Sequence, residues 1–254
     1  MSAAFSSLYA RHYDALYGKK DYAAESAYFE KLLRKQGIRP PSHILSFGAG
    51  TLNHEQFFAN KGYSVHGVEL SSDMVDRARN KIHTLSLDKI SIEQGDMRLY
   101  RASRAYDAVL IPFNVVSYCR SIKELEATIG AAARALRPGG VLAFDCWNGD
   151  VMRKDPPQDT WSRIALPGGV LYKLVQAGPV SKNNTFVRAL ELVAIEGGKT
   201  ETYHEDHTLA GWTPTQLRAA CKRHGFKAPF LYEWMSTKPV SKRWAITVVG
   251  VKKK

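Results

Sequence analysis

Two glycines between two short apolar segments constrain the fold of this chain more than any other feature. Residues 43–47 read His-Ile-Leu-Ser-Phe, and the turn Gly48-Ala-Gly50 follows directly. An apolar run of this length is typical of a buried parallel strand, and glycine lets the backbone turn sharply beside a ligand. A second strand-like run over residues 65–70 contains Glu69, 19 residues after Gly50. This spacing predicts a strand–turn–helix–strand unit whose carboxylate accepts hydrogen bonds from a ribose.

The turn differs from a dinucleotide-binding fingerprint. In Gly-x-Gly-x-x-Gly the third glycine would fall at Asn53, which disfavours NAD and FAD. The arrangement instead resembles motif I of class I S-adenosylmethionine (SAM)-dependent methyltransferases, which usually reads acid-x-Gly-x-Gly-x-Gly. Ser46 stands at the position of the acid, and Leu52 stands at that of the last glycine. In the resembling family the acid helps to hold the methionine end of SAM, so the resemblance leaves this contact without a residue.

Strand-like and helix-like segments alternate through the first half of the chain. After the glycine turn and Glu69, residues 89–97 alternate as a third strand does and end in Gly-Asp-Met. Residues 106–111 form a fourth apolar run, and residues 141–145 form a fifth. This uninterrupted βαβα alternation predicts an α/β fold, namely a doubly wound, Rossmann-like sheet of seven strands whose last two lie near the end of the chain.

The pattern changes after Trp147. Strand-like runs at residues 170–175, 186–195 and 200–209 follow the turn-forming sequences Pro-Gly-Gly, Lys-Asn-Asn and Glu-Gly-Gly. They predict an antiparallel β insertion after the fifth strand. We therefore expect residues 1–40 to form an N-terminal helical lid, residues 41–150 and 213–254 the SAM-binding domain, and residues 151–212 a cap over the substrate.

Tyrosine is concentrated near the N-terminus, where Tyr9, Tyr13, Tyr17 and Tyr22 fall within fourteen residues. A phenol offers a flat apolar face and a hydroxyl that donates or accepts, which suits a lid over a ligand. Packing of an aromatic-rich amphipathic segment on the main domain is the alternative. The sequence leaves both interpretations open.

Four further motifs narrow the resemblance. They are the Tyr-Asp-x-x-Tyr-x-x-Lys-Asp-Tyr opening, Phe-Asp-Cys-Trp-Asn-Gly at 144–149, His-Glu-Asp-His at 204–207 and the closing Lys-Pro-Val-Ser-Lys-Arg-Trp. Together they resemble methyltransferases found with bacterial surface-polysaccharide genes. This subgroup is similar in layout to the amino-sugar N,N-dimethyltransferases of deoxysugar pathways, which act on nucleotide-linked sugars.

The resemblance implies a set of site residues. The positions implied to bind SAM are Tyr13, Tyr22, Ser46, Gly48, Ala49, Gly50, Glu69, Leu70, Met74, Asp96, Met97 and Phe113. In the sugar dimethyltransferases a tyrosine of the first segment and a residue of the strand-four loop flank the substrate, and Tyr13 and Tyr118 match them.

A base is also expected, because a hydroxyl nucleophile must lose its proton. His204 and His207 would point to opposite sides of an alternating strand, and we expect His204 to face the cleft. A surface histidine in an acidic turn is the alternative. No third ligand is spaced for zinc, so no metal is expected.

Composition limits the partners. The chain has 36 Lys and Arg against 24 Asp and Glu, a net charge of +12. This charge suits an anionic partner, such as a nucleotide-linked sugar or glycan precursor, although scattered basic residues also serve solubility. The three cysteines show no ligand spacing, and no segment reads as a signal peptide or membrane span, so we expect a cytoplasmic protein with free thiols and no membrane insertion. A homodimer is compatible with the sequence.

The function expected is transfer of a methyl group from SAM to an oxygen or nitrogen of a small molecule in polysaccharide biosynthesis. Two alternatives stay open. An RNA methyltransferase would also use the positive charge, although nucleic acid is not the partner we expect. The strand-four loop, Ile-Pro-Phe-Asn, lacks the signature of methyltransferases that act on exocyclic amines of DNA bases and looks more like that of small-molecule methyltransferases. A methyltransferase-like binding module without catalysis is the second, because Ser46 and Leu52 depart from motif I.

Overall fold

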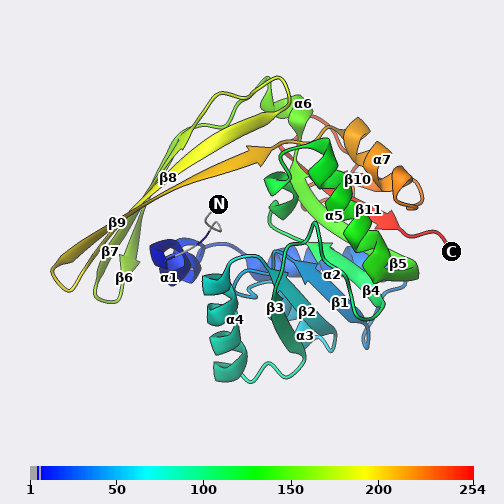
Figure 1. The fold of residues 1–254 in the computed structure, drawn as a ribbon, viewed down its shortest axis with the longest axis horizontal. Helices are drawn as coiled ribbons and strands as arrows, with labels where there is room; N and C mark the ends of the chain where they lie inside the picture. Colours follow the sequence, from blue (N-terminus) through cyan, green and yellow to red (C-terminus); the bar gives the residue numbers. More distant parts are fainter. Residues whose placement is uncertain (1–4, 6) are drawn as a thin grey trace.

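The computed structural model describes residue 5 and residues 7–254, which contain two β-sheets (Figure 1). The larger sheet has seven strands in the order β10-β11-β5-β4-β1-β2-β3. Its strands are β1 His43–Phe47, β2 Ser64–Glu69, β3 Ile90–Gln94, β4 Tyr106–Ile111, β5 Leu136–Trp147, β10 Phe230–Glu233 and β11 Ala245–Val251. Strands β1 to β5 pair in parallel, whereas β11 is antiparallel to both β5 and β10. The predicted doubly wound α/β sheet is confirmed.

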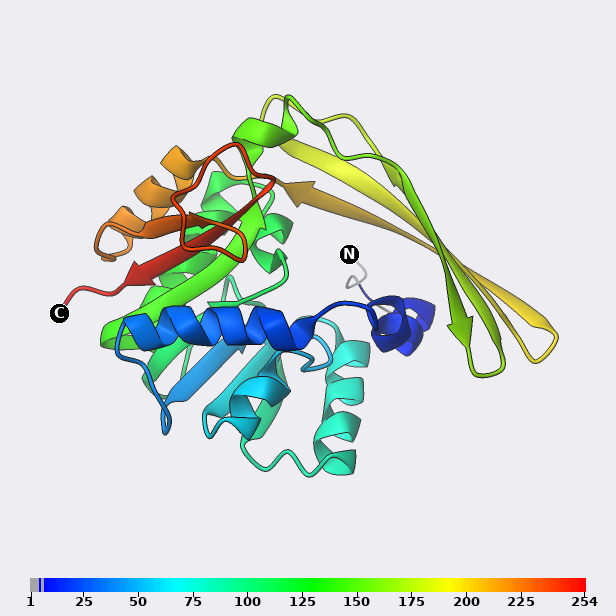
Figure 2. The same cartoon turned by 180° about the vertical axis from the view of Figure 1, so that it is seen from behind.

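Helices cover both faces of this sheet because its strands are apolar on both sides. Ile44 and Leu110 pack with buried side chains of α2 Tyr22–Lys35 and α3 Glu55–Asn60 on one face. Figure 2 shows α2 lying along this face, and α4 Ser72–Thr84 joins the same layer. Leu45 and Val109 point the other way, into a core with α5 Ile122–Ala135 and α7 Pro214–Arg223. One-residue alternation along the strands therefore sorts side chains into two cores.

The helix starts are set by side-chain caps. Asp21 accepts a hydrogen bond from the Ala24 amide at the start of α2, and Ser71 accepts one from the Met74 amide at the start of α4. Thr213 forms a full capping box at the start of α7. Each cap satisfies an amide that the helix itself leaves unpaired, so the loops that enter the helices have defined directions.

The smaller sheet is a four-stranded antiparallel meander inserted after β5 and the short helix α6 Gly149–Met152. Its strands are β6 Thr160–Leu166, β7 Gly169–Ala177, β8 Thr185–Glu196 and β9 Lys199–Ala210. Three of these strands were predicted, and β6 was missed. Strand β6 is an edge strand whose side chains are mostly exposed, so it lacks the apolar alternation that reveals a strand in sequence.

Helix α1 Ser7–Leu16 lies between the smaller sheet and α4 (Figures 1 and 2). Its side chains Leu8, Tyr9 and Tyr13 share a core with Leu171 and Leu190 of the meander. Among the described residues no helix is both long and apolar enough to cross a bilayer. The three cysteines are free and buried.

Candidate active site

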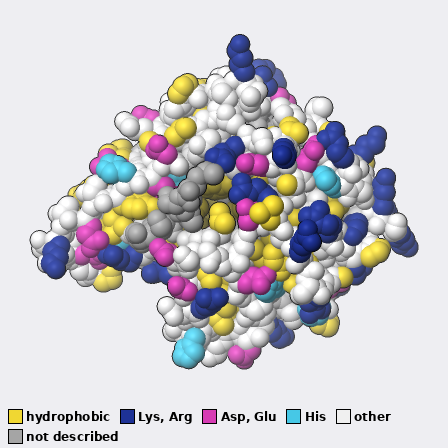
Figure 3. Space-filling model, in the orientation of Figure 1, with side chains coloured by type: hydrophobic (Ala, Val, Ile, Leu, Met, Phe, Trp, Pro, Cys, Tyr) yellow, Lys and Arg dark blue, Asp and Glu magenta, His cyan; other side chains and the backbone are white. Residues whose placement is uncertain are grey.

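A cavity of about 690 Å³ opens where the carboxyl ends of the parallel strands meet α1 and the meander. This is where open α/β sheets bind ligands. Figure 3 shows Lys and Arg side chains gathered beside a hollow near the centre of the face drawn. Of the predicted site residues, those that line the cavity are Tyr13, Tyr22, Gly48, Ala49, Gly50, Glu69, Leu70, Met74, Asp96, Met97, Phe113 and Tyr118.

The glycine turn and Glu69 form one hydrogen-bonded unit. The Gly50 amide donates to Glu69 Oε2 and the Ser71 amide donates to Glu69 Oε1, each at 3.0 Å. Burial raises the pKa of the Glu69 carboxyl, and these amides oppose the shift. Gly48 has φ +64°, and a Cβ there would lie 2.5 Å from Cγ1 of Val115. The turn therefore requires glycine for its backbone and for the close approach of the strand-four loop.

Leu52 and Ser46, the two residues that differ from motif I, face the interior of the protein and not the cavity. Leu52 adopts φ +66°, the left-handed backbone that a glycine takes without strain, and its side chain is completely buried in the core. Ser46 does not line the cavity, and its Oγ donates to Glu55 Oε1 at 2.6 Å. A direct contact of Ser46 with a ligand, expected from the sequence, is thus not supported by its position.

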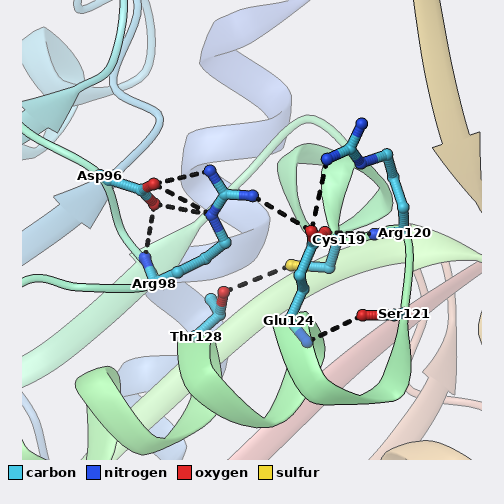
Figure 4. Close-up of polar contacts among 7 residues, drawn as sticks. All are labelled: Asp96, Arg98, Cys119, Arg120, Ser121, Glu124 and Thr128. Atoms are coloured by element: carbon cyan, nitrogen blue, oxygen red, sulfur yellow. Dashed lines mark hydrogen bonds and ion pairs between the residues drawn. The ribbon is translucent and has the colours of Figure 1, made fainter. Parts of the chain in front are cut away.

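Asp96 lies in the cavity wall but is already paired. Its carboxylate accepts hydrogen bonds from the Arg98 amide and guanidinium at 2.6 to 3.0 Å (Figure 4). Burial opposes ionisation of Asp96, but the Arg98 contacts hold its pKa below the ordinary value. Arg98 continues to Glu124, which also pairs with Arg120. Two of the arginines that line the cavity are therefore neutralised by carboxylates.

Tyr118 and His207 form the polar contact opposite the turn. The Tyr118 hydroxyl lies 2.9 Å from His207 Nδ1, and both side chains line the cavity. Burial, with the charges of Arg188 and Lys173, lowers the pKa of His207 to about 4. Burial also raises the pKa of Tyr118 well above its ordinary value. At neutral pH the imidazole is therefore neutral, and in its Nε2–H tautomer Nδ1 accepts a hydrogen bond from the phenol.

The structure corrects the choice between the two histidines. His204 is 70% exposed, lies near Glu191 on β8 and does not line the cavity. His207 stands on the opposite side of β9, in phase with the buried Leu209. The sequence contained a signal for this choice, namely the apolar Leu209. Side chains two residues apart on a strand share a face, so His207 lies on the same face as Leu209 and His204 lies on the other. Other lining residues that the sequence analysis missed include Asn53, His54, Trp147 and Arg188.

The loop after β4 is held by a buried acid at the tip of β5. Phe113 and Asn114 both adopt positive φ, and the Asn114 amide donates to Asp145 Oδ2 at 2.9 Å. Asp145 is 1% exposed, and burial raises its pKa to about 7. The acid thus supports a loop whose Phe113 ring lines the cavity, at the cost of a buried charge.

Replacement of Asp145 by asparagine is expected to change the pH dependence of stability. A raised folded-state pKa favours the folded state fully below about pH 4, and this contribution is lost as the pH rises through about 7. Asparagine keeps an acceptor for the Asn114 amide but does not titrate. Urea unfolding should therefore show the variant gaining stability relative to the wild-type protein between pH 5 and pH 8, by at most about 3 kcal/mol.

Asp107 provides a control of opposite sign. Burial opposes ionisation of Asp107, but hydrogen bonds from the His43 amide and Arg137 lower its pKa. Replacing Asp107 by asparagine should destabilise the protein at neutral pH and less so in acid. If the wild-type protein and Asp145→Asn had equal free energies of unfolding at pH 5 and again at pH 8, the interpretation of Asp145 as a buried charge would be contradicted.

Comparisons with known proteins agree with this geometry. Residues 44–140 match the family model described as a methyltransferase domain. The chain is 35% identical over 156 residues to dTDP-3-amino-3,4,6-trideoxy-alpha-D-glucopyranose N,N-dimethyltransferase of Streptomyces venezuelae, an alignment that covers 56% of this chain and 63% of the relative. It is 27% identical over 246 residues to dTDP-3-amino-3,6-dideoxy-alpha-D-glucopyranose N,N-dimethyltransferase of Streptomyces fradiae, covering 90% and 88%. With the first relative, the match spans less than two thirds of that protein's length.

Solved structures extend the likeness to the whole chain. The Streptomyces venezuelae protein DesVI superposes with a TM-score of 0.80 at 25% identity, over 97% of this chain and 99% of the other. The sugar N-methyltransferase KedS8 from a Streptoalloteichus species superposes with a TM-score of 0.83 at 22% identity, over 100% and 96%. The resemblance inferred from motif I is borne out over residues 44–140, which match a methyltransferase domain. The whole chain shares the fold of DesVI and of the sugar N-methyltransferase KedS8.

Proposed function

We propose that this chain is a SAM-dependent methyltransferase that methylates an oxygen or nitrogen of a small molecule, namely a nucleotide-linked sugar or a glycan precursor. The observation that carries the proposal is the hydrogen bond from the Gly50 amide to the Glu69 carboxylate, in the cavity at the carboxyl ends of the parallel strands. The names of the relatives, which are dimethyltransferases of dTDP-linked amino sugars, support the class of acceptor. We further propose that the reaction takes place in the cytoplasm, in polysaccharide biosynthesis.

The residues present fit SAM. Glu69 offers carboxylate oxygens for ribose hydroxyls, Met74 and Met97 supply apolar wall, and Tyr13 and Tyr22 close the side toward α1. When bound, SAM supplies a methyl group on a positively charged sulfur. Asp96, which we propose for the adenine amino group, would have to share its oxygens with Arg98.

The chain's contribution to methyl transfer is to position the acceptor and to receive its proton. Holding a nucleophile in line is worth up to about 7–11 kcal/mol, and the walls of the cavity provide that constraint. A proton leaving the acceptor can pass to the Tyr118 oxygen while the phenol proton moves to His207 Nδ1, because these atoms are already hydrogen-bonded. Tyr13, also in the wall, is proposed to flank the acceptor.

Arg188 indicates where an anionic acceptor binds. Its side chain lines the cavity and makes no ion pair with any residue that the structure describes. The guanidinium lies 5.9 Å from the Trp147 ring and also borders a recess of about 340 Å³ that contains Trp147 and Trp244. This position suits a nucleotide-linked acceptor, because the guanidinium can bind the diphosphate while the aromatic recess accommodates the flat base.

Replacing Arg188 by glutamine is expected to raise KM for a nucleotide-linked acceptor about tenfold, because one charge-assisted contact to phosphate is lost. The affinity for SAM should not change. Arg163→Gln, an exposed arginine on β6 of the same sheet, is the control for net charge and should behave like wild type. Equal KM values for the two variants would argue against a phosphate contact at Arg188.

We propose that α1 acts as a lid over SAM and that the meander, residues 151–212, acts as a cap over the acceptor. Asp14 of α1 ties the lid to the turn, because it accepts hydrogen bonds from Thr51 Oγ1 at 2.5 Å and Asn53 Nδ2 at 3.0 Å. Lys81 of α4 lies 3.0 Å from the same carboxylate. Burial opposes ionisation of Asp14, yet these contacts hold its pKa below the ordinary value.

Loss of this tie should speed SAM release. For Asp14→Ala we expect the SAM dissociation rate, measured by stopped-flow fluorescence, to rise about tenfold, since two or more hydrogen bonds of about 1 kcal/mol each are removed from the closed state. Asp76→Ala, an exposed acid on α4, should leave the rate unchanged. An unchanged rate in Asp14→Ala would mean that α1 does not gate the cavity.

Calorimetry with SAM followed by a mass-shift screen of nucleotide sugars tests the function directly. The proposal expects SAM binding and a gain of one or two methyl groups on a nucleotide-linked acceptor. Absence of SAM binding would favour a binding module without catalysis. SAM binding with methylation of RNA, and of no sugar nucleotide, would favour the RNA methyltransferase alternative.

A further inference from the structure

The second ring nitrogen of His207 is buried and faces a carboxylate. Nδ1 of this histidine is paired with the Tyr118 hydroxyl, whereas Nε2 has no hydrogen-bond partner among the described residues. Oε1 of Glu205 lies 3.7 Å from Nε2, at ion-pair distance but beyond a hydrogen bond. Contacts within an active site are often long before a substrate binds and shorten in the complex. The Nε2–H group and the Glu205 carboxylate are therefore placed to pair.

The periodicity of β9 brings these two side chains together. Tyr203, Glu205 and His207 follow one another at intervals of two residues, so all three lie on the same face of the strand. The side chains of Glu205 and His207 are only 12% and 6% exposed. The contact is thus built into a single strand and is largely shielded from water.

Hydrogen-bond donors converge on the Glu205 carboxyl group. The Phe5 amide donates to its two oxygens at 2.9 and 3.1 Å, and the Tyr203 hydroxyl donates to Oε2 at 2.5 Å. Burial raises the pKa of Glu205, and these donors oppose the shift. Donors favour the charged form of a carboxyl group, and the Nε2–H group of His207 adds a further one.

Two cations act on His207 from the meander. Arg188 and Lys173 lie on β8 and β7, and their charges, together with burial, disfavour a protonated imidazole. A proton that passes from the Tyr118 hydroxyl to Nδ1 creates this protonated form. A carboxylate next to Nε2 offsets the cost, because an anion close to the imidazolium stabilises it in a site shielded from water.

We propose that Glu205 completes a relay with Tyr118 and His207, in which it orients the imidazole and stabilises its protonated form. This inference rests on the proposed function. The acceptor loses its proton to the Tyr118 oxygen and gains the methyl group in its place, while the phenol proton passes to Nδ1 of His207. Glu205 stays ionised throughout and fixes the tautomer with hydrogen on Nε2, which leaves Nδ1 able to accept. Glu205 acts through His207 and is therefore a positioning residue.

Glu205→Gln removes the charge but keeps the shape and an oxygen acceptor. We expect kcat to fall about 10- to 100-fold, because the imidazolium loses its charged partner, while KM and SAM affinity stay close to the wild-type values. In a His207→Ala background the same substitution should change kcat less than about twofold, because its effect passes through His207.

Glu201→Gln is the matched control. Glu201 is an exposed acid of β9 that also ties the meander to the N-terminal region, through an ion pair with Arg11 of α1 at 3.0 Å. Its replacement removes one carboxylate from the same strand without touching His207, so kcat should stay at the wild-type value.

The tautomer of His207 tests the inference without any substrate. Nitrogen NMR of the imidazole ring should find hydrogen on Nε2 in the resting wild-type protein. Glu205→Gln should shift the Nε2 signal, and Glu201→Gln should not. Thermal unfolding of each variant serves as the folding control, and the wild-type tautomer needs no variant.

Hydrogen on Nδ1, or an Nε2 signal that ignores Glu205→Gln, would overturn the inference. An equal loss of kcat with and without His207 would overturn it too, because Glu205 would then only anchor the Phe5 amide. Wild-type protein that binds no SAM, or that methylates no nucleotide-linked acceptor, would refute the proposed function. The NMR result would in that case still decide whether Glu205 orients His207.

Discussion

Glu69→Gln is expected to weaken SAM binding by about 100-fold or more. The Glu69 carboxylate lines the cavity while its two oxygens accept from the Gly50 and Ser71 amides. Each hydrogen bond from a ribose hydroxyl to a charged acceptor is worth about 1.5–3 kcal/mol, so the loss of two such bonds exceeds about 3 kcal/mol. The amide nitrogen would also face one of the two backbone donors and disturb the turn.

Glu93→Gln is the matched control for Glu69. Glu93 lies on the neighbouring strand β3, but its side chain is 48% exposed and does not line the cavity. Calorimetric titration with SAM should give a wild-type dissociation constant for this variant. If Glu69→Gln also bound SAM as wild type does, the cavity would not be the cofactor site, and the assignment would reduce to the fold alone.

His207→Ala is expected to lower kcat about 10²- to 10⁴-fold, the range for loss of a positioned proton acceptor, with little change in SAM affinity. Tyr118→Phe should lower kcat to a similar extent. Because the two side chains act through one hydrogen bond of 2.9 Å, the double variant should be no slower than the worse single variant.

His204→Ala is the control on the opposite side of β9, and it should retain the wild-type kcat. The pH profile provides a second readout. Because the pKa of His207 is lowered to about 4, protonation of this histidine should not reduce the rate between pH 8 and about pH 5. The role given to His207 would be contradicted if the rate fell with an apparent pKa near the ordinary value for histidine. It would also be contradicted if His204→Ala lost as much kcat as His207→Ala.

The larger sheet and the core of the site could be predicted from sequence because their signals are local. Strand β1, the turn at Gly48 and Gly50, and Glu69 at the end of β2 lie within 27 residues, and the Gly50–Glu69 hydrogen bond links parts of one strand–turn–helix–strand unit. In such a unit the spacing along the chain nearly determines the spacing in space. The meander was predicted in part, because β6 is exposed at an edge and carries no apolar alternation.

The contacts between distant segments could not be predicted in the same way. His207 meets Tyr118 across 89 positions in the chain, and Arg98 takes up the carboxylate of Asp96 that was expected to face the ligand. The phase of β9, and with it the choice between His204 and His207, depends on which face the meander turns toward the cavity. Packing of the meander against α1 and the loop after β4 decides that face.

The sequence by itself determined the class of fold, the position of the glycine turn and the carboxylate that closes it, since strand periodicity and glycine spacing express backbone geometry over short distances. Only the tertiary structure decided which histidine enters the cavity, which of the arginines that line it makes no ion pair with a described residue, and how Glu55 reaches Ser46. These features depend on side chains brought together by packing, and their energies come from burial and charge in a space that no local pattern describes.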